Sequence, residues 1–138
     1  RFSEEDIYEA CKYVNADSFI DKLPHGIHEE IIEKGENLSQ GQRQLLSFAR
    51  TVIHKPQVLI LDEATANIDT ETEVLIQESL EKMKNIGTML VVAHRLSTIQ
   101  HADQIIVLQK GEVIERGNHQ DLLHQRGYYY KLYQLQFE

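Results

Sequence analysis

The chain has 138 residues, 41% of them apolar, one cysteine, and 14 basic against 22 acidic side chains, for a net charge of −8. This length suits one domain or a large part of one, the acidic balance argues against nucleic acid as a partner, and a single cysteine excludes an internal disulfide. No apolar run approaches the roughly 18 residues of a membrane helix, and the first residues lack a signal-peptide layout, so we expect a soluble intracellular piece.

The first part of the chain is predicted to be helical. Ser3-x-x-Asp6 indicates a helix start, and a short second helix is predicted over residues 16–23. Ser39 is expected to cap a longer helix that Pro56 ends. The buried side of that helix is predicted to carry Leu45, Leu46, Phe48, Ala49, Val52 and Ile53.

Strand and helix patterns alternate in the rest of the chain. Residues 58–61 are continuously apolar, which is typical of a strand buried on both faces, and residues 88–93 predict a second buried strand. Thr70-x-x-Glu73 predicts a capping box for the helix between them. This order predicts an α/β fold, a mainly parallel sheet with flanking helices.

The remaining predicted elements lie near the carboxyl end. They are a hairpin through 104–108 and 112–114, a short helix capped by Asn118, and a last helix over 128–137. We expect one or two tyrosines of this last helix to pack on the core, although tyrosines can also stack on nucleobases.

Two carboxylates and a histidine follow the predicted strands. Asp62 and Glu63 come after the first strand and His94 after the second, so neighbouring strands would bring all three to one edge. Asp62 would then hold Mg²⁺, Glu63 would activate water as a general base, and His94 would contact a terminal phosphate. In the alternative interpretation, Asp62 and Glu63 merely cap a turn after the strand. The apolar run before them and His94 after the second strand argue against this alternative.

A phosphate contact is predicted at the start of the long helix. Ser39, Gly41 and Gln42 lie where free N–H groups and the positive end of the helix dipole attract an anion. On the helix signal alone, an ordinary capped helix is the simpler explanation. The phosphate-cradling loop G-x-x-x-x-G-K-[ST] does not occur in these residues, which therefore look like part of a catalytic domain.

In these segments the chain resembles the nucleotide-binding domain of an ABC transporter of the exporter type, a P-loop ATPase. LSQGQ at 38–42 resembles the family's signature motif, and VLILDE at 58–63 resembles its Walker B motif. Residues 66–69 look like the D-loop, His94 like the switch histidine, and EIIEKG at 30–35 like the exporter X-loop. The resemblance covers nearly all of the chain.

The resemblance implies head-to-tail pairs of such domains with ATP and Mg²⁺ between them. Asp62, Glu63 and His94 would serve one ATP, while Ser39, Gly41 and Gln42 would reach the ATP of a second nucleotide-binding domain. Whether that second domain belongs to a homodimer or a heterodimer stays open.

The resemblance also implies other partners and a location. Asp69 of the D-loop would lie at the dimer interface, and Glu30 and Glu33 would lie near the transmembrane domain of the same transporter. Residues 1–57 would form a helical subdomain, and residues 58–138 the carboxyl-terminal part of the ATPase core. The parent protein would work at the cytoplasmic face of the cell membrane.

Two departures and two alternatives accompany this interpretation. Gln40 stands where the family more often has glycine. Ala66-Asn67-Ile68 replaces the usual Ser-Ala-Leu of the D-loop, and this second departure concerns the coupling between the two ATP sites. The alternatives are an ABC-type ATPase of DNA repair or translation, and a non-catalytic interaction fragment. Without a phosphate loop, we expect these residues alone to hydrolyse no ATP and to self-associate.

Overall fold

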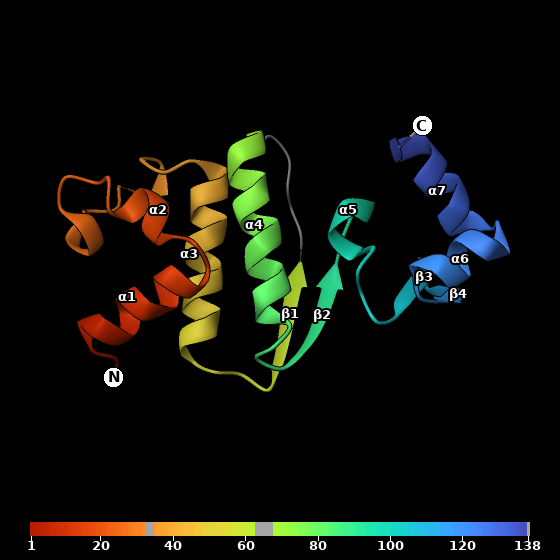
Figure 1. Ribbon diagram of the computed structural model, residues 1–138, viewed down its shortest axis with the longest axis horizontal. Helices are drawn as coiled ribbons and strands as arrows, with labels where there is room; N and C mark the ends of the chain where they lie inside the picture. The colour runs from red at the N-terminus through yellow and green to blue at the C-terminus, as the bar shows by residue number, and fades with distance from the viewer. Residues whose placement is uncertain (33–34, 63–67, 138) are drawn as a thin grey trace. The chain divides into compact units, whose positions relative to one another are not determined.

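The computed structural model describes residues 1–32, 35–62 and 68–137. These residues fall into two compact units (Figure 1). The first unit contains residues 1–61 and 68–90 as far as they are described, and the second contains Asp62 and residues 91–137. The predicted boundary between residues 57 and 58 stays a prediction.

The first unit begins with short helices. They are α1 (Glu4–Tyr13), α2 (Asp17–Ile20) and the 3-10 helix η1 (Gly26–His28). The capping box at Ser3 and Asp6 is confirmed, since each side chain bonds the other residue's backbone N–H. Helix α2 is shorter than the predicted 16–23, because Pro24 disfavours helical geometry at Leu23.

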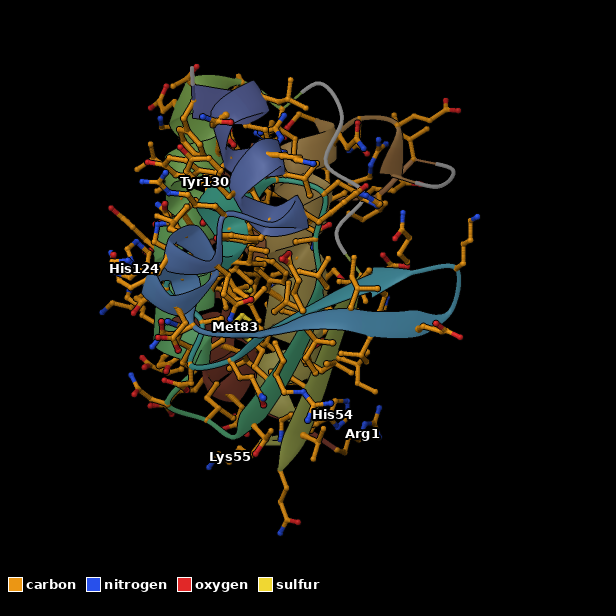
Figure 2. The ribbon with its side chains drawn as sticks, turned by 90° about the vertical axis from the view of Figure 1, so that its right-hand side faces the viewer. Arg1, His54, Lys55, Met83, His124 and Tyr130 are labelled. Carbon is orange, nitrogen blue, oxygen red and sulfur yellow. The ribbon has the colours of Figure 1, made fainter. Side chains whose placement is uncertain are left out.

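Two long helices and two strands complete the first unit's core. They are α3 (Gln40–Ile53), β1 (Val58–Asp62), α4 (Thr70–Met83) and β2 (Thr88–Val92), of which β2 is shared with the second unit. Leu45 and Phe48 of α3, Leu59 of β1 and Met83 of α4 belong to one buried cluster. Met83, labelled in Figure 2, is fully buried, and so is Leu45.

The start of α4 differs from the prediction by one residue. Asp69, not Thr70, is the N-cap, and its Oδ2 accepts both the N–H of Thr72 at 3.1 Å and the Thr72 hydroxyl at 3.0 Å. A carboxylate at this position also stabilises the positive end of the helix dipole, which a threonine hydroxyl cannot do.

Strands β1 and β2 are neighbours, and Figure 1 draws their arrowheads at the same end, so the pair is parallel. Thr88 donates its N–H to the Gln57 carbonyl at 2.9 Å where the two strands begin. The prediction that β1 is buried on both faces is wrong for these residues. Leu59 is 1% exposed, but Val58 and Ile60 are 58% and 69% exposed, because among the described residues helices cover only one face.

The second unit is a hairpin with three helices. They are α5 (Leu96–Ile99), β3 (Ile105–Gln109), β4 (Glu112–Gly117), α6 (His119–Gln125) and α7 (Tyr128–Phe137). The hairpin is confirmed as antiparallel, and Lys110 and Gly111 both adopt positive φ, at 51° and 78°, in its turn. The predicted Asn118 cap is confirmed as a capping box with Asp121.

Helix α7 has the predicted bounds, and the prediction that one or two of its tyrosines pack on the core is confirmed for Tyr129 and Tyr133, whereas Tyr128 is exposed. Tyr129 is 1% exposed and lies in a buried cluster with Leu96, Ile105 and Leu122. Its hydroxyl is 2.7 Å from His119 Nδ1. Among the described residues, no helix has the length and apolar character needed to cross a lipid bilayer.

Candidate functional site

Asp62 is the last residue of β1 and is exposed. His94 follows β2 by two residues and is also exposed. The sequence predicted that these residues converge if β1 and β2 are neighbouring strands, and the two strands are neighbours. Because the strands are parallel, Asp62 and His94 lie at the same end of the pair. Glu63 lies outside the described residues, so convergence of all three side chains stays a prediction.

The donor set at Asp62 suits a magnesium ion better than a fully protein-coordinated metal. Within the described parts of the chain, no group of three or more His, Cys, Asp or Glu side chains comes together. Mg²⁺ is commonly held by one or two carboxylates, with phosphate oxygens and waters as its other ligands. One exposed carboxylate at a strand end fits that requirement.

The backbone around His94 is held by a residue that sequence analysis missed. Gln136 of α7 donates from Nε2 to the His94 carbonyl at 3.2 Å, and its Oε1 accepts the N–H of Leu96 at 2.9 Å. No motif or periodicity marks Gln136, because the contact spans a sequence separation of 42 residues.

Ser39 and Gln42 form a capping box at the start of α3. The Ser39 hydroxyl oxygen accepts the Gln42 N–H at 3.1 Å, and Gln42 Oε1 accepts the Ser39 N–H at 3.0 Å. Ser39 is exposed, and a hydroxyl that accepts one bond still has a proton to donate. The cap thus fixes the Ser39 side chain at the helix start while leaving it able to donate to an anion.

Gly41 is buried, unlike its neighbours Ser39 and Gln40. A Cβ at this position would overlap the Thr72 Cγ2 methyl group of α4 and come within 3.2 Å of Ile68 Cγ2. The absence of a side chain at Gly41 is therefore needed inside this domain, for the approach of α3 to the start of α4. The sequence alone suggested only a phosphate contact for this glycine.

Asp69 is engaged locally by its cap to Thr72. Hydrogen bonds from the Thr72 side chain and backbone lower the pKa of this carboxyl below its usual 3.8. The capping bonds within this chain are enough to explain why an aspartate occupies position 69. The location of Asp69 at a dimer interface stays a prediction.

The segment around Glu30 is held by Asn37. Its side chain donates to the Glu30 carbonyl at 3.0 Å and accepts the Ile32 N–H at 3.1 Å. Glu30 is exposed, and Ile31 and Ile32 are 52% and 56% exposed. Glu33, the other glutamate of the predicted contact, lies outside the described residues.

Comparisons with known proteins bear on these features. The pattern of the family described as ABC transporter matches residues 2–66. The chain is 56% identical over 136 residues to the probable multidrug resistance ABC transporter ATP-binding/permease protein YheH of Bacillus subtilis, covering 99% of this chain and 20% of that protein. The chain belongs to the ABC transporter family. It is also 52% identical to the ATP-dependent lipid A-core flippase of Syntrophus aciditrophicus, covering 99% of this chain and 23% of that protein.

A solved structure agrees in fold with this ABC transporter chain. A bacterial Atm1-family ABC exporter with ATP bound matches with a TM-score of 0.86 and 38% identity, over 99% of this chain and 24% of that one. The α/β fold of a P-loop ATPase is thereby confirmed. The chain spans about a fifth to a quarter of the length of the relatives it matches.

Proposed function

We propose that this chain is part of the ATP-binding and ATP-hydrolysing domain that powers substrate export by an ABC transporter. The observation that carries the proposal is the placement of Asp62 and His94 at the same end of two neighbouring parallel strands, Asp62 as the last residue of β1 and His94 two residues after β2. Names of similar proteins, which include a multidrug resistance transporter and a lipid A-core flippase, support an export role.

Asp62, Glu63 and His94 divide the work at one ATP. Asp62 holds Mg²⁺, which supplies charge neutralisation for the phosphates when it is bound. Glu63 accepts the proton of the attacking water, and His94 donates a hydrogen bond to the terminal phosphate. The exposure of Asp62 and His94 supports these roles, because both side chains are open to a ligand.

Ser39, Gly41 and Gln42 serve the ATP of a second nucleotide-binding domain. Support comes from the exposed Ser39 hydroxyl at the start of a 14-residue helix, where an anion is stabilised by the helix dipole. Asp69 lies at the interface of the two domains and couples their sites. Homodimeric and heterodimeric pairs both satisfy this arrangement.

The segment from Glu30 to Glu33 contacts the transmembrane domain of the same transporter. Two adjacent exposed isoleucines, Ile31 and Ile32, support this part of the proposal, because an apolar pair beside a carboxylate suits a protein contact. This contact transmits the closing of two domains around ATP to the membrane part at the cytoplasmic face of the membrane.

The 138 residues alone hydrolyse no ATP. They contain no G-x-x-x-x-G-K-[ST] loop, so the main phosphate cradle of such a site is missing from them. Phosphate release by the purified chain, abolished by Glu63→Gln, would contradict this statement.

The test of the proposed function compares the full-length parent transporter in membranes with its Glu63→Gln variant. Loss of ATP turnover with retained ATP binding is expected, because glutamine keeps the shape of the side chain but cannot accept the proton. Glu78→Gln is the matched control, since Glu78 is an exposed glutamate of α4 away from the strand ends. Unchanged turnover in Glu63→Gln would reject Glu63 as the base.

A further inference from the structure

The backbone on both sides of Arg95 is bridged by one side chain. The amide of Gln136 donates to the carbonyl before Arg95 and accepts the N–H after it, at 3.2 Å and 2.9 Å. We propose that Gln136 is a positioning residue for His94, acting through the backbone of residues 94–96. The inference rests on the proposed function, in which His94 contacts the terminal phosphate.

The two bonds lie in the turn that leads from β2 into α5. Arg95, the N-cap of α5, is extended, with φ −110° and ψ 126°, and its side chain makes no capping hydrogen bond to α5. The N–H of Leu96 belongs to the first turn of α5, which has no acceptor within its own helix. By accepting this N–H and donating to the His94 carbonyl, Gln136 ties both ends of the turn, and so restrains the direction of the His94 side chain.

A primary amide is suited to this task. Its two ends are one donor and one acceptor in a single plane, so one side chain meets a C=O and an N–H at the same time. A glutamate at position 136 keeps the acceptor for Leu96 but has no proton for the His94 carbonyl. An alanine removes both bonds.

Gln136 lies near the carboxyl end of α7, and the amino end of this helix is anchored to the rest of the unit. The Glu115 carboxylate accepts the N–H groups of Tyr128 at 3.1 Å and Tyr129 at 2.7 Å, which anchors the first turn of α7. The buried ring of Tyr129, with its hydroxyl 2.7 Å from His119 Nδ1, anchors the inner face. Gln136 lies two turns further on that same face, given 3.6 residues per turn.

The packing between α5 and α7 is continuous with this contact. Leu96 is 4% exposed and belongs to the same buried cluster as Tyr129, with Leu132 of α7 packed against it. The amide contact is thus the polar end of an apolar helix–helix contact. Gln136 itself is exposed.

The experiment measures ATPase kinetics of the full-length transporter in lipid bilayers. Gln136→Ala is expected to lower kcat about 10-fold, with KM for ATP changed less than about 2-fold, because a loosened His94 affects the transition state more than ATP binding. The kcat of Gln136→Glu is expected to lie between those of the wild-type transporter and Gln136→Ala. Gln134→Ala is the matched control, since Gln134 is also in α7 but bonds the Tyr130 hydroxyl at 3.1 Å.

A double-mutant comparison separates positioning from a structural role. If Gln136 acts through His94, Gln136→Ala has no further effect on kcat in a His94→Ala background. Should Gln136→Ala fail to assemble, Gln136→Met, which keeps the length of the side chain, enters the same comparison. A kcat equal to wild type, or a loss that multiplies with that of His94→Ala, would overturn the inference.

The same measurements distinguish this inference from the proposed function. If His94→Ala lowers kcat well below that of the wild-type transporter but Gln136→Ala equals wild type, only the role of Gln136 is overturned. If His94→Ala is as active as wild type, the role of His94 is rejected, and the inference is rejected with it.

Discussion

The methyl group of Thr72 occupies the space that a side chain at Gly41 would need. A Cβ on Gly41 would overlap Thr72 Cγ2, while the hydroxyl of the same threonine donates to Asp69 Oδ2 at 3.0 Å. One residue of α4 thus meets both the proposed signature motif and the aspartate of the proposed D-loop. Thr72 links, within one domain, two segments to which we assign contacts with a partner domain.

This relationship predicts that Gly41→Ala destabilises the chain and that Thr72→Ser reverses part of the loss. Overpacking of a close helix contact costs about 1–3 kcal/mol. Serine removes the methyl group but keeps the hydroxyl that bonds Asp69. Urea unfolding of the four combinations measures this, with Thr72→Ser alone as the control. Equal destabilisation by Gly41→Ala in both backgrounds would contradict the packing role of Gly41.

The cap at Asp69 predicts a dependence of stability on pH. Bonds from Thr72 lower the pKa of the folded-state carboxyl below 3.8, so its contribution is present above that value and is lost as pH falls through the folded-state pKa. Thermal melting between about pH 6 and pH 3 is expected to show a smaller acid-induced loss in Asp69→Asn than in wild type.

The control for this pH experiment is the cap of α1. The pKa of Asp6 is lowered in the same way, by bonds from the Ser3 backbone and side chain, so part of the acid sensitivity remains in Asp69→Asn. Asp6→Asn should remove that remaining part. Melting curves that stay parallel for wild type and Asp69→Asn over the whole pH range would contradict the assignment.

The uncovered face of β1 predicts self-association of the 138-residue chain. Val58, Ile60 and Leu90 are 58%, 69% and 55% exposed on adjacent strands, and clustered apolar side chains on a strand pair favour association. Sedimentation velocity is expected to show oligomers that Ile60→Thr reduces. Leu135→Thr, at an 81% exposed position of α7, is the control and should change little. A clean monomer at high concentration would contradict this prediction.

The anchor of α7 predicts a cost for removing Glu115. Its carboxylate accepts two backbone N–H groups at the start of α7, so Glu115→Ala leaves both without this acceptor and is expected to cost about 1–2 kcal/mol. Chemical unfolding measures the loss. Glu115→Gln keeps one acceptor oxygen and should cost less, whereas Glu112→Ala, at an exposed position of the same strand, should cost little. Equal effects of Glu115→Ala and Glu112→Ala would reject the anchor.

Elements that depend on near neighbours in sequence were predictable. The caps at Ser3, Ser39 and Asn118 follow from side chains that bond the backbone three residues away. The turn at Lys110-Gly111 follows from the ease with which glycine adopts positive φ. The cap of α4 was missed by one residue, because Asp69 and Thr70 both suit that position and only the folded chain shows which side chain bonds Thr72.

The local elements, the α/β class and the order of the motifs could thus be predicted from the residues alone, because these depend on short-range bonding, periodicity and spacing. Three relationships became visible only in the folded chain: Gly41 is needed against Thr72, one face of β1 is uncovered among the described residues, and Gln136 holds the backbone beside His94. Each of these joins residues that are distant in sequence or depends on what covers a surface. Such relationships leave no periodic or spacing pattern in the chain, so they emerge only when the elements pack.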